Sequence, residues 1–138
     1  MAGMYGQAQQ MQREIDQSHL LSDIELANLQ ELTLKVTVYD RLLNPKPHAP
    51  LSLPDETECL FGQWYYGEQN QGQQRDADFR RMELPHRLVH SSGQAALEAH
   101  ARGELEEALK QVGQMEEANA AVMRNVKGLV HARLQSLA

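Results

Sequence analysis

The stretch Ser22–Leu43, SDIELANLQELTLKVTVYDRLL, decides the fold, because its apolar residues recur at steps of three and four. That spacing places them along the side of an α-helix. Ser22 followed by Glu25 is a capping box, which predicts that the helix begins near Ser22. The apolar residues form two adjacent rows, and we expect them to be buried together as one broad face: Leu29, Leu32, Val36, Tyr39 and Leu43 in the first row, and Ile24, Ala27, Leu34 and Val38 in the second.

Three further helices are expected downstream, separated by residues that disfavour helical geometry. Prolines at positions 45, 47 and 50 end the first helix, since proline lacks the amide donor and restricts the residue before it. A short second helix carries Cys59 and Trp64, and we expect Trp64 in the core. A polar loop over 68–75 leads to the third helix. The expected helices span about 22–43, 52–66, 76–101 and 104–137, with a kink at Pro85 and a break at Gly103.

The last helix carries apolar residues at helical spacing, and no β-type alternation appears along the chain. We expect the following row to be buried: Leu105, Ala108, Val112, Met115, Val122, Val126 and Leu129. The fold class predicted is therefore all-α, a four-helix bundle with a short second helix and a kinked third helix. With 138 residues, the chain has room for one domain over 22–138, preceded by a polar tail or helical extension over 1–21.

The composition excludes several classes of function. Asp and Glu number 19 against 13 Lys and Arg, giving a net charge of −6, which argues against a nucleic-acid partner. No apolar run approaches the roughly 18–20 residues of a membrane span, and the first residues lack an apolar signal core. The one cysteine, Cys59, excludes an internal disulfide and fits a reducing compartment. A cytoplasmic protein without a membrane partner is expected.

His86 and His90 could bind one metal ion together. Four residues complete slightly more than one helical turn, so the two imidazoles lie on the same face of the third helix. The thiolate of Cys59 would complete a set of ligands that zinc prefers over magnesium or calcium. The alternatives are a solvated or packed histidine pair, and a cysteine that serves as a small buried hydrophobe.

Two motifs together resemble a known family. The segment Cys59-Leu60-Phe61-Gly62-Gln63-Trp64 is followed, 27 positions after the cysteine, by His86-Arg87-Leu88-Val89-His90. This pair of motifs resembles the chemoreceptor zinc-binding domain, and the resemblance extends over about residues 22–102. In that family a further histidine lies on the first helix, and the corresponding position here holds Glu31.

Glu31 is a candidate ligand on independent grounds. It interrupts the apolar row that contains Ala27 and Leu34, so its carboxylate is expected to point into the bundle. A buried carboxylate needs a partner, because an isolated ionised one is costly to desolvate. Three partners are considered: a zinc ion bound directly, a zinc ion that keeps a water in its fourth position with Glu31 beside it, and an Arg or Lys from another helix.

The resemblance implies a zinc-binding regulatory domain without catalysis of its own, with Zn²⁺ held by Cys59, His86, His90 and Glu31. It also implies a homodimer and a signalling partner such as a chemoreceptor or a diguanylate cyclase, with zinc- or oxidant-dependent signalling. Two alternatives are a small zinc-dependent hydrolase, with Glu31 as general base, and a metal-free helical interaction module. The remaining histidines are interpreted as solvated: His19, His48, His100 and His131. Four glycines are expected at close contacts: Gly62, Gly93, Gly113 and Gly128.

Overall fold

The protein is described by a computed structural model that covers residues 2–44, 52–68, 70, 72 and 76–137. The described residues form helices and no strand, which confirms the all-α class. The prolines expected to end the first helix, and His48, lie outside the described residues. The helices are α1 (Ala2–Leu43), α2 (Leu60–Tyr65), α3 (Ala77–Arg80), α4 (Glu83–Ala101) and α5 (Leu105–Leu137).

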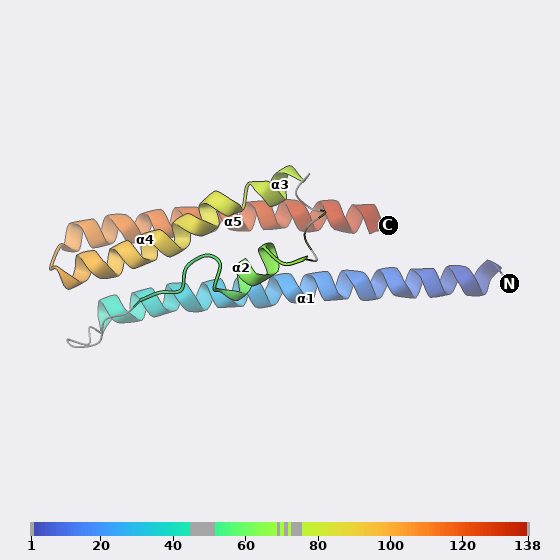
Figure 1. Ribbon diagram of the computed structural model, residues 1–138, viewed down its shortest axis with the longest axis horizontal. Coiled ribbons are helices and arrows are strands. Elements are labelled where there is room, and N and C mark those ends of the chain that lie inside the picture. The colour runs from blue at the N-terminus through green and yellow to red at the C-terminus, as the bar shows by residue number, and fades with distance from the viewer. Residues whose placement is uncertain (1, 45–51, 69, 71, 73–75, 138) are drawn as a thin grey trace.

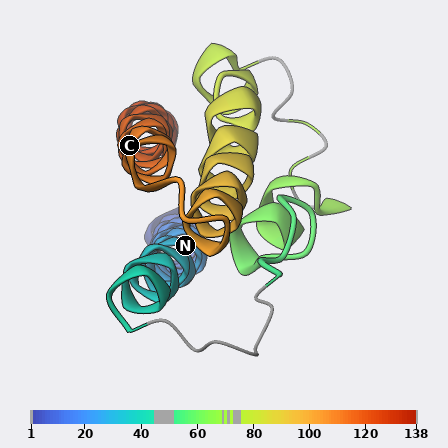
Figure 2. The ribbon, with the colours of Figure 1, turned by 90° about the vertical axis from the view of Figure 1, so that its left-hand side faces the viewer.

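The helices form an elongated bundle built around the pair α4 and α5. Figure 1 shows α4 running beside α1 in the same direction, while α5 returns antiparallel to both. Helices α4 and α5 share the most extensive contact, and α1 packs against α2, α4 and α5. Seen end on in Figure 2, α1, α4 and α5 form a triangle, with α2 beside α4 on the side away from α5. No helix in the described part of the chain has the length and apolarity needed to cross a membrane.

Helix α1 begins at Ala2, so the capping box at Ser22 does not start it. The prediction of a start near Ser22 was wrong, because the preceding residues contain no proline and are rich in Gln and Met, which favour helix. Of the two forms considered for residues 1–21, the described part of that segment adopts the helical extension. Residues 3–12 are exposed, and this end of α1 projects beyond the other helices in Figure 1.

Only one of the two apolar rows on α1 is buried. Ile24, Ala27, Leu34 and Val38 are at most 6% exposed, as expected. The first row was wrongly predicted to be buried with them, and its members are 37–78% exposed: Leu29, Leu32, Val36, Tyr39 and Leu43. The helical repeat places the two rows on roughly opposite sides of α1, so both could be covered only if other elements enclosed the helix.

The second and third helices are shorter than expected. Cys59 is not inside the second helix, because it is the N-cap of α2, whereas Trp64 is buried as expected. The expected third helix is divided into α3 and α4 by a bend at Arg81 and Met82. Pro85, near the start of α4, has no amide proton to donate to the carbonyl of Arg81. The Nδ2 of Asn125 on α5 donates to that carbonyl instead, at 3.2 Å.

Glycines set the close contacts and the α4–α5 turn. Gly103 has φ +78°, the left-handed conformation that ends α4. Close contact is confirmed at Gly93, where a Cβ would lie 3.0 Å from Leu53, and at Gly128, where it would lie 2.8 Å from Asp78. The prediction of a close contact is wrong at Gly113, which has open space beside it. The predicted row of α5 is buried except for Leu105, which is 60% exposed.

Candidate metal centre

The two histidines of α4 point the same ring nitrogen into the interior. His86 and His90 are 1% and 3% exposed, and their Nε2 atoms are 3.2 Å apart. On the outer side of its ring, the Nδ1 of His90 donates to the carbonyl oxygen of Pro54 at 2.7 Å. Because a carbonyl can only accept, the proton of neutral His90 lies on Nδ1 and the lone pair lies on Nε2. His90 is thus oriented so that the lone pair of Nε2 faces the cluster.

Cys59 reaches the same point from the start of α2. It is 1% exposed, and its Sγ lies 3.2 Å from the Nε2 of His86. The backbone N–H of Gly62 donates to this sulfur at 3.2 Å. A Cβ at Gly62 would lie 1.8 Å from the carbonyl oxygen of Glu56, so glycine allows the chain before Cys59 to fold back onto α2. The close approach predicted for Gly62 is therefore confirmed.

Glu31 completes the cluster from α1. Its side chain faces the interior and is 3% exposed, as its place in the apolar row predicted. The Oε1 atom lies 3.2 Å from the Nε2 of His86 and 3.3 Å from the Nε2 of His90. Its other oxygen, Oε2, is buried and makes no hydrogen bond with any described group. The Arg or Lys partner considered for Glu31 is not among its contacts in the described chain, where both of its ion-pair partners are histidines.

These residues fit a zinc ion. One donor atom from each of Glu31, Cys59, His86 and His90 lies within 4.8 Å of every other, and all four residues are buried. Zinc–ligand distances of about 2.0–2.3 Å imply that the ligand atoms of a tetrahedral site lie roughly 3.3–3.6 Å apart. The observed contacts of 3.2–3.3 Å are close to that range. Two imidazoles, a thiolate and a carboxylate are also chemically suited to zinc.

The pKa values describe how the same groups interact when they bind protons and no metal ion. Burial is the largest effect on Glu31 and raises its pKa, but hydrogen bonds and charge from His86 and His90 outweigh it and lower the pKa to about 2. Burial lowers the pKa of His90, yet hydrogen bonds with Cys59 and Glu31 raise it to about 10. The pKa of His86 is raised for the same reasons, and that of Cys59 is lowered. The cluster therefore strongly favours positive charge at its centre.

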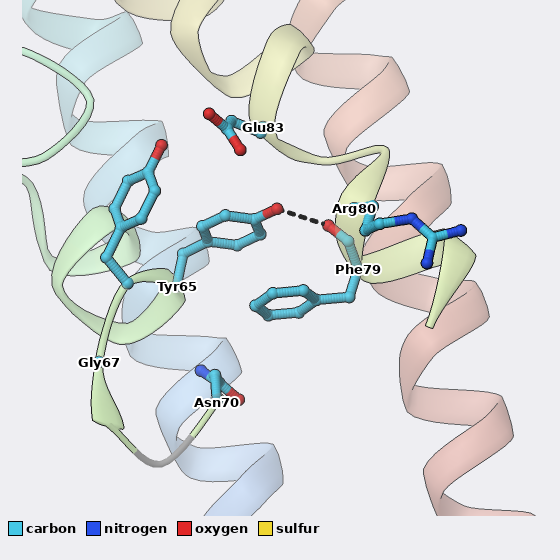
Figure 3. A pocket seen from close by; sticks show the side chains of 7 residues that line it. Tyr65, Gly67, Asn70, Phe79, Arg80 and Glu83 are labelled. Carbon is cyan, nitrogen blue, oxygen red and sulfur yellow. Dashed lines mark hydrogen bonds between the residues drawn. The ribbon is translucent and has the colours of Figure 1, made fainter. Parts of the chain in front are cut away.

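Aromatic residues of α2 and α3 form a wall beside the cluster. The ring of Phe61 lies 4.5 Å from that of His86, and Trp64 packs edge-on against Phe61 at 5.5 Å. Further out, Tyr65 stacks on Phe79 at 4.2 Å and donates its hydroxyl proton to the Phe79 carbonyl, as Figure 3 shows. The surface pocket in that view has a volume of about 420 Å³. None of the clustered residues is among those that line it: Tyr65, Tyr66, Gly67, Asn70, Phe79, Arg80 and Glu83.

The remaining described histidines lie outside the cluster, and two groups that contact it or its surroundings were not anticipated. His19 and His131 are exposed and His100 is half-buried, and none of them belongs to the cluster. The sequence reasoning missed the carbonyl of Pro54, which binds His90, and Gln94, whose Oε1 accepts the N–H of Leu53. The signal for Gln94 was its position four residues after His90, which continues the face of the helix that begins at His86.

Fold and site together define a helical domain with a buried cluster of potential zinc ligands drawn from three separate parts of the chain. Residues 32–97 match the family model of the chemoreceptor zinc-binding domain, so this part of the chain is similar to that family. The match contains Cys59, His86 and His90 and begins one residue after Glu31, consistent with glutamate in place of the family's first histidine. Searches of curated proteins and of solved structures give no match to the chain.

Proposed function

We propose that Glu31, Cys59, His86 and His90 bind one Zn²⁺ ion and that the chain is a zinc-responsive regulatory domain. The observation that carries this proposal is the convergence of four buried donor atoms, with Oε2 of Glu31 left without a hydrogen bond to any described group. Bound zinc would supply the positive charge that this cluster favours. It would also join α1, the start of α2 and α4, which are far apart in the sequence.

A regulatory site is favoured over a hydrolytic one by the number of protein ligands. Catalytic zinc sites usually have three protein ligands and an open position, whereas structural sites have four. Glu31 supplies the fourth donor here, and three surface pockets of the described chain have none of the clustered residues in their linings. A crystal structure of the zinc-bound protein separates the two functions. Four protein ligands are expected, and a bound water replacing Glu31 would favour the hydrolase.

Signalling follows from loss of the restraint that the metal provides. Histidine and thiolate bind zinc in their deprotonated forms, so metal release is coupled to proton uptake and to loosening of the helices that the metal joins. A peroxide can transfer one oxygen atom to the thiolate of Cys59, giving a sulfenate and water or an alcohol. The sulfenate is a poorer zinc ligand, so oxidation and zinc loss would act in the same direction. The signal would pass to a partner such as a chemoreceptor or a diguanylate cyclase.

The outer face of α1 supports the homodimer. The row Leu29, Leu32, Val36, Tyr39 and Leu43 is exposed and has the alternating three- and four-residue steps of a coiled-coil seam. Met4, Met11 and Ile15 continue this spacing along the projecting end of α1, where a helix without a partner is only marginally stable. A second copy would cover both parts of the row. Residues 22–138 then act as one domain, with the projecting end of α1 as an extension of it.

Sedimentation equilibrium tests this interface. The wild type is expected to be a dimer, and Val36→Glu is expected to be a monomer, since a charge would lie in the seam. Leu84→Glu is the control, because Leu84 is 61% exposed on α4, away from the row. A monomeric wild type, or a dimeric Val36→Glu variant, would show that this face does not join two copies.

Metal analysis tests the zinc site itself. Mass spectrometry of the untagged protein is expected to find about one zinc per chain, as one tetrahedral site requires. Cys59→Ser and His90→Ala should each lose most of this zinc, while the control His131→Ala, at an exposed position on α5, should retain it. No zinc in the wild type, and none taken up on addition, would favour the metal-free interaction module.

A further inference from the structure

Helix α4 holds the segment Leu53–Glu56, here called the strap, at three points. The Oε1 of Gln94 accepts the backbone N–H of Leu53 at 2.8 Å. One turn earlier, the Nδ1 of His90 donates to the carbonyl of Pro54 at 2.7 Å. A turn before that, the Nε of Arg87 donates to the carboxylate of Glu56 at 3.2 Å. The strap therefore lies along one face of α4, and its central contact is to His90, a residue of the candidate metal centre.

The contact with Pro54 decides which nitrogen of His90 is available. When Nδ1 donates to the carbonyl, the lone pair lies on Nε2, which faces Glu31 and His86. Such partners of metal-binding histidines fix the tautomer and the ring orientation, and their loss typically weakens metal binding roughly 10–100-fold. Here that partner is a backbone oxygen, so its position depends on whatever holds the strap.

Gln94 is the side chain best placed to hold it. Pro54 has no N–H of its own, so the nearest backbone donor on its amino-terminal side is Leu53, and that donor is bound by Gln94. The side chain of Leu53 also packs over Gly93, the residue before Gln94. Arg87 is a weaker anchor, because its side chain is 50% exposed and also pairs with Glu83.

The same strap leads to a second residue of the cluster. It ends three residues before Cys59, and the carbonyl of Glu56 lies where Gly62 leaves room for it. Fixing Leu53 thus constrains the path of the chain toward the thiol as well as the carbonyl that orients His90. We infer that Gln94 is a positioning residue of the metal centre, which orders His90 and Cys59 through the backbone of Leu53 and Pro54. This inference rests on the proposed zinc function.

The test compares three variants by competition titration with a chromophoric zinc chelator. Gln94→Met keeps the length and helix propensity of the side chain but removes the acceptor, and zinc affinity is expected to fall about 10–100-fold. Gln94→Glu retains an acceptor and is expected to bind within about threefold of the wild type, because the N–H of Leu53 keeps its partner. Gln111→Met on α5 is the matched control, since the side-chain amide of Gln111 donates to Glu107 within its own helix.

A second readout separates positioning from a general loss of stability. In nitrogen-15 NMR spectra of the zinc protein, the Nδ1 proton of His90 is expected to exchange slowly with solvent in the wild type and in Gln94→Glu, and faster in Gln94→Met. Wild-type Leu53 should have a protected amide, a measurement that needs no variant. Unchanged zinc affinity and proton exchange in Gln94→Met, or an unprotected Leu53 amide, would overturn the inference while leaving zinc binding in place. A wild type that binds no zinc would instead remove the proposed function.

Discussion

Replacing Glu31 by glutamine in metal-free protein measures the electrostatic interaction within the cluster. Burial raises the pKa of Glu31, but the two histidines lower it from 4.5 to about 2. That difference corresponds to about 3 kcal/mol of folding free energy. The pKa of His90 rises from 6.5 to about 10 through the same contact and through Cys59. Because the pKa shifts of Glu31 and His90 both include the interaction between these two residues, the shifts are not added, and we use the smaller one, about 3 kcal/mol.

The sign of each shift gives the pH range of this stabilisation. The pKa of Glu31 is lowered in the folded state, so its contribution is present above pH 4.5 and is lost as the pH falls through about 2. The pKa of His90 is raised, so its contribution is fully present below pH 6.5 and is lost as the pH rises through about 10. Metal-free protein should therefore gain most from this contact between pH 4.5 and 6.5.

Urea unfolding of chelator-treated protein, followed by circular dichroism, measures the effect. The free energy of unfolding of the wild type is expected to exceed that of Glu31→Gln by about 3 kcal/mol near pH 5.5, and the difference should disappear toward pH 2. Glu25→Gln is the control, because Glu25 is an exposed carboxylate on the same helix. A difference under about 1 kcal/mol near pH 5.5, the size expected of an exposed ion pair, would refute the reasoning. So would a difference that does not change with pH.

Zinc binding near neutral pH is expected to release protons, because the metal-free imidazoles hold protons and zinc requires their lone pairs. Calorimetry in buffers of different ionisation enthalpy should then give different apparent heats of binding. Equal heats would contradict the coupling between zinc binding and proton release. Gly62→Ala should lower both folding stability and zinc affinity, since its Cβ would lie 1.8 Å from the carbonyl oxygen of Glu56. Gly113→Ala is the control: Gly113 has open space beside it, so this change should stabilise the fold by about 0.5–1 kcal/mol. Tyr65→Phe should cost about 1 kcal/mol by removing the hydroxyl donor to Phe79, without changing zinc affinity; a parallel loss of zinc would show that the aromatic wall shapes the site.

The helices could be predicted well because helical periodicity is a local property of the sequence. It identified the buried row of α5, and the row that contains Leu34 and Val38 on α1. It could not say that Leu29 and Val36 remain exposed, since periodicity shows which residues share a side but not which sides other elements cover. The start of α1 was missed for a related reason. A capping box favours a helix start but does not prevent a helix from continuing through it.

The cluster of candidate ligands was predictable because its members left local signals. The spacing of His86 and His90 places both on one side of α4, and Glu31 stood out as a charge in an apolar row. The groups that orient these side chains left weaker signals. The carbonyl of Pro54 is a backbone atom whose position depends on how the strap crosses α4, and no side-chain pattern encodes that path. Gln94 matters only through this crossing, so its role emerged from the structure.

Helix α1 is the element through which the metal site can affect the rest of the molecule. Glu31 lies on its inner side, while the exposed row proposed as the dimer seam lies on the outer side of the same continuous helix. Among the described helices, α1 makes a smaller contact with α4 and α5 than these two make with each other, so a zinc ion at the proposed site would add to what fixes α1 in place. Loss of that ion would free a helix rather than a loop. A shift near Glu31 would therefore be carried along α1 to its projecting end.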